Sequence, residues 1–216
     1  MARITVLGGT GYAGGNLVAV AAQRGHSVVS YSRSLPENPV DGVEYRTGDL
    51  TDPAVLSAGI TDADVVVSAL SPRGELAGAG VLRSLEKRLA GAAAAAGVRL
   101  GVIGGAGSLL VAPGGPKVAD TPEFPAAIKP EADEMGGVLD DLRAGDPALD
   151  WFFVSPAGGF GPWAAGEATG VYRIGGDVLL VDDEGESNIS GADLAAAVVG
   201  EIEEPAHRRA RFTVAY

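Results

Sequence analysis

Short apolar runs alternate with amphipathic helical patterns along the whole chain. Strand-like runs are predicted at 4–7, 27–31, 43–46, 65–70, 99–103, 151–155 and 212–215. The spacing of apolar residues predicts helices at 12–24, 76–96, 129–143 and 191–201, and one that begins at Pro53 behind the capping residue Asp52. Uninterrupted apolar strands separated by helices are typical of βαβ units. The pattern therefore predicts an α/β protein, Rossmann-like and doubly wound, with a mainly parallel sheet.

The pattern changes after Pro156, where the chain becomes rich in glycine. A hairpin formed by residues 170–174 and 178–181 is predicted there, followed by the helix at 191–201. We expect residues 156–216 to include a small lobe on the substrate side of the sheet. Since no linker or internal repeat divides the sequence, residues 1–216 are expected to form a single domain.

Composition and charge exclude several kinds of protein. Of the 216 residues, 46% are hydrophobic and 20% are charged, which is typical of a folded domain. The net charge of −12 repels phosphate backbones and argues against nucleic acid as a partner. No apolar run is long enough for a membrane span, and the first residues lack a signal-peptide pattern. With no cysteine and two histidines, a metal centre is not expected, a cytoplasmic location is expected, and monomer and dimer stay open.

The most informative segment is a glycine-rich turn between the first predicted strand and the first predicted helix. It reads G-x-x-G-x-x-G, from Gly8 to Gly14. Such a turn lets the backbone approach a pyrophosphate, whose negative charge is favoured at the amino end of the helix. The alternative is a strand–helix turn without a ligand, and the missing Gly-Lys-Ser/Thr excludes a Walker A loop. The segment predicts binding of a dinucleotide by Gly8, Thr10, Gly11, Tyr12, Ala13 and Gly14.

The end of the second predicted strand indicates which dinucleotide is bound. An acidic residue there would accept a hydrogen bond from the ribose 2′-hydroxyl of NAD, whereas an arginine would accommodate the additional phosphate of NADP. The chain reads Tyr-Ser-Arg-Ser from Tyr31 to Ser34, with no acidic residue. Arg33 therefore favours NADP(H) over NAD(H), which stays possible, and the alternative is a solvated loop arginine.

The glycine turn and several motifs downstream resemble those of the atypical short-chain dehydrogenase/reductases. The similarity is to the NAD(P)H-binding, epimerase-like branch, which includes proteins named NADH-flavin reductases and, more distantly, flavin/biliverdin-IXβ reductase. It extends over the whole chain through Gly48–Asp52, Asp64–Leu70, Gly104–Leu109, Trp151–Ala157, Tyr172–Asp177 and Ser190–Ala195.

The resemblance implies further positions around the cofactor. Asp49 and Leu50 would border the adenine, and the segment Ala69, Leu70 and Ser71 would pass the pyrophosphate and ribose. Gly104–Ser108 would lie beneath the nicotinamide, with Gly104 and Gly105 binding the cofactor, and the backbone of Pro156 and Ala157 would meet the carboxamide. For each position the alternative is ordinary α/β architecture, such as a turn or a cap.

The usual catalytic residues of this superfamily are a serine and a Tyr-x-x-x-Lys motif, in which the lysine lowers the pKa of the tyrosine. Ser108 stands at a plausible serine position, but no Tyr-x-x-x-Lys follows it. Ser108 and Lys129 are the remaining catalytic candidates, with a loop cap and a solvated lysine as the alternatives. Phe124, Phe160 and Trp163 could line an aromatic substrate or form local core.

Three functions are consistent with these features. The first is an NADP(H)-dependent oxidoreductase that passes hydride to a flavin or a quinone-like acceptor, with FMN or FAD as a small-molecule substrate. A flavin ring is itself an electron sink, so this reaction does not need the missing tyrosine. The second is a non-catalytic NADP(H)-binding sensor. The third is an NAD-dependent epimerase or isomerase, which the missing tyrosine and Arg33 both disfavour.

Overall fold

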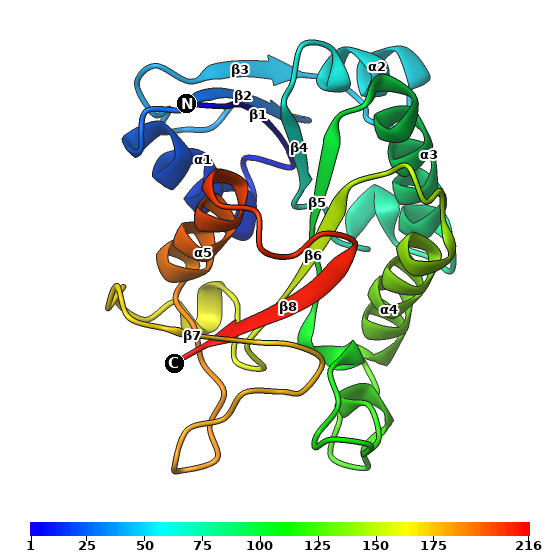
Figure 1. Ribbon diagram of the computed structural model, residues 1–216, viewed down its shortest axis with the longest axis vertical. Coiled ribbons are helices and arrows are strands. Elements are labelled where there is room, and N and C mark those ends of the chain that lie inside the picture. The colour runs from blue at the N-terminus through cyan, green and yellow to red at the C-terminus, as the bar shows by residue number, and fades with distance from the viewer.

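The computed structural model describes residues 1–216, and it is built on one eight-stranded sheet in the order β3-β2-β1-β4-β5-β6-β8-β7 (Figure 1). The strands are parallel except for β7, which runs antiparallel to β8. The predicted fold class is thereby confirmed. The strands are β1 (Arg3–Leu7), β2 (Ser27–Ser32), β3 (Glu44–Thr47), β4 (Val65–Ser68), β5 (Arg99–Ile103), β6 (Trp151–Pro156), β7 (Arg173–Gly175) and β8 (Ala210–Ala215).

The helices cover both faces of the sheet, as Figure 1 shows. One apolar core lies between the sheet and α1 and α5, and the other lies between the sheet and α2, α3 and α4. The helices are α1 (Tyr12–Gln23), α2 (Pro53–Ile60), α3 (Val81–Ala96), α4 (Lys129–Ala144) and α5 (Gly191–Glu203). None of them is long and apolar enough to cross a lipid bilayer.

Local capping chemistry explains the amino ends of two helices. The Asp52 side chain accepts a hydrogen bond from the Ala54 amide at 2.8 Å, and Pro53 is the first residue of α2. Ser190 caps α5 in the same way, through the Asp193 amide at 3.0 Å. These ends are encoded within a few residues, so they could be predicted from the sequence.

Three predicted boundaries or pairings are wrong. The helix expected from residue 76 begins at Val81, because Gly78 and Gly80 have φ of 114° and 80° and interrupt it. The strand expected at 65–70 ends at Ser68. The hairpin expected between 170–174 and 178–181 does not form, because β7 pairs with the free edge of β8 and Val178 bridges to Leu110.

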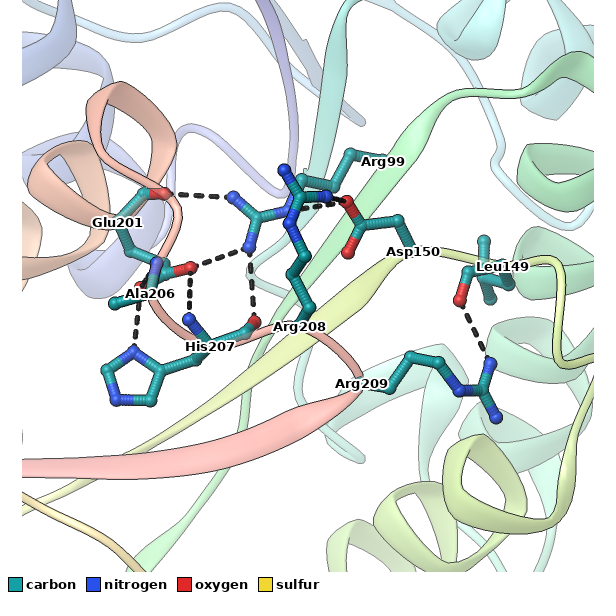
Figure 2. Close-up of polar contacts among 8 residues, drawn as sticks. All are labelled: Arg99, Leu149, Asp150, Glu201, Ala206, His207, Arg208 and Arg209. Atoms are coloured by element: carbon teal, nitrogen blue, oxygen red, sulfur yellow. Dashed lines mark hydrogen bonds and ion pairs between the residues drawn. The ribbon is translucent and has the colours of Figure 1, made fainter.

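A buried ion pair joins the amino end of β5 to the end of α5 (Figure 2). Nη2 of Arg99 lies 2.6 Å from Oε1 of Glu201, and the two side chains are 9% and 4% exposed. The Glu201 carboxylate also accepts hydrogen bonds from the backbone amides of Ala206 and His207, at 3.2 and 3.0 Å. Burial acts to raise the pKa of Glu201, but hydrogen bonds from Arg99 and His207 outweigh it and leave the pKa below its usual value. These contacts fix the loop that leads into β8.

Candidate functional site

A cleft of about 390 Å³ opens at the carboxyl ends of β1, β2 and β4. Because β2 and β4 flank β1 on opposite sides, the cleft lies at the switch point where doubly wound sheets bind ligands. The cleft brings together Gly8, Thr10, Gly11, Arg33, Asp49, Leu50, Ala69, Leu70 and Ser71, all of which the sequence had predicted. Ser32, beside Arg33, also lines the cleft, and sequence reasoning missed the remaining lining residues, which are Gly48, Thr51, Arg73, Gly74, Glu75 and Leu76.

The glycines of the first turn have different physical roles. Gly8 has φ of +84°, a backbone conformation that side chains disfavour. A Cβ added to Gly14 would lie 2.2 Å from the Gly8 carbonyl oxygen, so Gly14 is required for close packing of α1 on the turn. A Cβ added to Gly11 would meet only that carbonyl, at 3.3 Å. A side chain at Gly11 therefore needs a shift of only a few tenths of an ångström at this one contact, and Gly11 lines the cleft.

The amino end of α1 presents backbone donors beside the turn. Gly11 is the N-cap residue, and no side chain caps this end. The first-turn amides of Tyr12, Ala13 and Gly14 have no partner within the helix, which is the arrangement that binds phosphate groups. None of these three residues is among those that line the cleft. The Tyr12 hydroxyl instead accepts a hydrogen bond from the Gly191 amide at 3.1 Å.

The far side of the cleft carries both charged and polar groups. Arg33 follows β2, and its Nη1 lies 3.3 Å from Oε2 of Glu75, with side chains 71% and 77% exposed. Oδ1 of Asp49 accepts hydrogen bonds from the Thr51 hydroxyl and amide, at 2.7 and 2.8 Å, and these bonds lower the pKa of Asp49. Because the carboxyl ends of parallel strands lie at one edge of the sheet, the loop after β4 could have been expected to line the cleft as well.

The residues expected at the nicotinamide end lie at the carboxyl ends of β5 and β6, where Pro156 is the last residue of β6, but they line no part of the cleft. A Cβ on Gly104 would lie 2.0 Å from Cζ of Phe153, so packing alone requires this glycine. Ala157 is buried, and Pro156 pairs with Val214 of β8. Gly105 faces open space. Contact of these four residues with a cofactor stays a prediction.

The two catalytic candidates are engaged by other groups. Nη1 of Arg211 donates to the Ser108 hydroxyl at 2.9 Å, and Arg211 also binds the carboxylate of Asp177. Nζ of Lys129 donates to the carbonyl oxygen of Ala119 at 3.0 Å and to carboxylate oxygens of Asp120 and Asp133 at 2.9 and 3.2 Å. Neither residue lines the cleft, so a catalytic role for either stays a prediction.

Behind the cleft, Glu86 of α3 is buried against the end of β4. Its Oε1 accepts a hydrogen bond from the Ser68 hydroxyl at 2.5 Å, and Oε2 has no partner. Burial raises the pKa of Glu86 from 4.5 to about 7, and the Ser68 hydrogen bond opposes the rise. The stabilisation from a protonated Glu86 is therefore complete below pH 4.5 and is lost as the pH rises through 7.

We expect Glu86→Gln to remove this pH dependence, because the amide is neutral at every pH. Urea unfolding at pH 5 and pH 8 should show that the variant gains up to about 3 kcal/mol relative to the parent protein over this interval, at about 1.4 kcal/mol per pKa unit. If the two proteins lose stability in parallel between these pH values, Glu86 does not titrate as described.

A glycine-rich turn that opens a helix at the switch point of a doubly wound parallel sheet defines a dinucleotide-binding protein of the Rossmann class. The chain belongs to the NAD(P)H-binding family, whose profile matches residues 8–205. This confirms the resemblance to the atypical short-chain dehydrogenase/reductases. The family comprises NAD(P)-dependent oxidoreductases and epimerases, and the chain is an NAD(P)(H)-binding protein of this kind.

Known proteins similar to the chain carry different names. The uncharacterized protein YwnB of Bacillus subtilis is 37% identical over 215 residues, covering 98% of this chain and 97% of that protein. A structure from Streptococcus pneumoniae named a "putative NADH-flavin reductase" is 32% identical, with a TM-score of 0.84 and coverage of 100% and 99%. A structure from Bacteroides thetaiotaomicron named a "putative epimerase" is also 32% identical, with a TM-score of 0.88 and coverage of 100% and 97%.

Proposed function

We propose that this protein is an NADPH-dependent oxidoreductase that transfers hydride to a flavin or a quinone-like acceptor. The observation that carries the proposal is the cleft, in which the glycine turn and the guanidinium of Arg33 lie together at the switch point of the sheet. The turn provides a place for the pyrophosphate, and Arg33 provides a cationic group for the adenosine end. A second arginine, Arg73, lines the same cleft.

The choice of acceptor rests on the catalytic groups that the chain lacks. No Tyr-x-x-x-Lys follows Ser108, so the chain has no proton donor of the kind that carbonyl reduction and epimerisation use in this superfamily. A bound nicotinamide supplies the hydride, and a flavin or quinone ring accepts it without a protein acid at a carbonyl oxygen. The chain then has to hold two rings together and exclude water. The name of the Streptococcus pneumoniae relative agrees with this acceptor class.

A non-catalytic NADP(H) sensor is the second candidate function. It is favoured by the contacts of Ser108 with Arg211 and of Lys129 with Asp120, since both catalytic candidates already have partners. A sensor would bind the dinucleotide in the same cleft without oxidising it. Measured oxidation of the bound dinucleotide therefore distinguishes the oxidoreductase from the sensor.

The proposal is tested by measuring NADPH and NADH oxidation with FMN, FAD, quinones and aldehydes, beside calorimetric binding of both dinucleotides. We expect oxidation with flavins or quinones and none with aldehydes. Arg33→Ala should weaken NADPH binding roughly 10- to 100-fold, because a charge-assisted hydrogen bond to the 2′-phosphate contributes about 1.5–3 kcal/mol. NADH binding should change by less than about twofold.

Two results would contradict the proposal in different ways. Tight NADPH binding without oxidation by any acceptor would favour the sensor. An equal loss of NADPH and NADH affinity in Arg33→Ala would show that this arginine does not select the phosphate. A suitable control is Arg46→Ala, since Arg46 lies on the neighbouring strand β3 but does not line the cleft.

A further inference from the structure

Two arginines on the adenosine side of the cleft are each paired with a glutamate. Nη1 of Arg33 lies 3.3 Å from Oε2 of Glu75, and Nε of Arg73 donates to Oε2 of Glu131 at 2.8 Å. Both arginines line the cleft, and so does Glu75, but Glu131 lies on α4 and does not. Glu75 is therefore the glutamate that shares the cleft with an arginine.

The backbone of the loop after β4 places Glu75 against Arg33. Gly74 has φ of +60°, and a Cβ added to it would lie 3.6 Å from Nη1 of Arg33. The loop thus passes directly beside the guanidinium, and Glu75 follows within a short 3-10 turn, Gly74–Leu76. Asp49 is the other acidic residue of the cleft, and its Oδ1 is already bound by Thr51.

We propose that Glu75 determines how strongly the cleft prefers dinucleotides with a 2′-phosphate, an inference that rests on the proposed function. A 2′-phosphate must compete with the Glu75 carboxylate for Arg33, and the two negative groups repel each other. A ribose 2′-hydroxyl can instead donate a hydrogen bond to Glu75, as it does to the acidic residue after the second strand in NAD-binding proteins. Since the Arg33–Glu75 pair is largely exposed, a phosphate can replace the carboxylate.

Glu75, on the loop after β4, thus provides the carboxylate that the end of β2 lacks. The residues at the end of β2 provide an arginine and two serines but no carboxylate. The arginine favours NADPH, whereas the glutamate moderates that preference and retains a partner for NADH. The ratio of the two affinities is therefore set by a pair of residues, and Arg33 alone does not set it.

The test uses adenosine 2′,5′-bisphosphate and AMP as probes, because they differ only at the 2′ position. Calorimetric titration compares the parent protein with Glu75→Gln and with Glu184→Gln, an exposed glutamate outside the cleft that carries the same change of charge. We expect Glu75→Gln to bind the bisphosphate about 3- to 10-fold more tightly and AMP no more tightly. The gain should shrink at high salt, and it should be smaller when Arg33→Ala is added, because only the direct repulsion between Glu75 and the 2′-phosphate then remains.

An unchanged affinity of Glu75→Gln for the bisphosphate would overturn the inference. An equal gain for AMP, or an equal gain in Glu184→Gln, would also overturn it, since either result would indicate a general effect of net charge. These outcomes leave the proposed function intact as long as the parent protein binds and oxidises NADPH. If the parent protein bound neither NADPH nor NADH, the proposed function itself would fail.

Discussion

Replacement of Gly11 by valine is expected to abolish binding of NADPH and NADH while the protein stays folded. Gly11 lines the cleft at the amino end of α1, and its backbone is extended, with φ of −75° and ψ of 170°, which valine adopts readily. The valine side chain would occupy the space of the pyrophosphate. Losing two charge-assisted hydrogen bonds, worth about 1.5–3 kcal/mol each, raises Kd at least roughly 100-fold. Calorimetry with both dinucleotides measures this effect.

Two other glycines provide controls for the Gly11 experiment. Gly176→Val introduces the same side chain into open space outside the cleft, so binding and stability should both be retained. Gly14→Ala should destabilise the fold, because its Cβ would lie 2.2 Å from the Gly8 carbonyl oxygen. Unaltered dinucleotide binding by Gly11→Val would show that the glycine turn has only an architectural role.

Truncation of Glu201 to alanine is expected to lower the free energy of unfolding by about 3–5 kcal/mol, the usual consequence of breaking a buried ion pair. The change leaves the Arg99 guanidinium without its main charged partner and removes the acceptor of the Ala206 and His207 amides. Urea unfolding at neutral pH measures the loss. The contacts in Figure 2 lie at the amino ends of β5 and β6, whereas the cleft lies at the carboxyl ends of the strands. NADPH affinity of the folded variant should therefore be unchanged.

Matched variants separate burial from charge in this second experiment. Glu44→Ala breaks the exposed pair with Arg46, and it should lower stability by less than about 1 kcal/mol. The double variant Arg99→Met and Glu201→Leu replaces both charges with apolar groups, so it should lose less stability than Glu201→Ala alone. If Glu201→Ala matches the exposed control, the ion pair does not hold the loop before β8.

The sheet and most of the cleft could be predicted from the sequence for reasons that act over short distances. β-branched runs form buried strands, and Pro53 and Gly97 mark helix ends through their own backbone preferences. Gly8 and Gly11 stand directly between the first strand and the first helix, so their place in the turn follows from adjacency alone. Arg33 follows the second strand in the same direct way.

Side-chain partners could not be predicted, because they depend on strand order. Arg99 and Glu201 are 102 residues apart, and Arg33 and Glu75 are 42 apart. Neither pair has a sequence signal, because periodicity shows which residues are buried but not which strands become neighbours. Lys129 illustrates the limit, since it was a catalytic candidate and the fold places Asp120 and Asp133 beside it.

The sequence by itself determined the alternation of strands and helices, the glycine turn and the arginine after β2, since local backbone preference and hydrophobic periodicity are encoded within a few residues. Only the tertiary structure decided that β7 joins β8, that Glu75 lies against Arg33, and that Ser108 is held by Arg211. These contacts join segments far apart in the chain. They form only after the order of the strands has brought the segments to the same edge or face of the sheet.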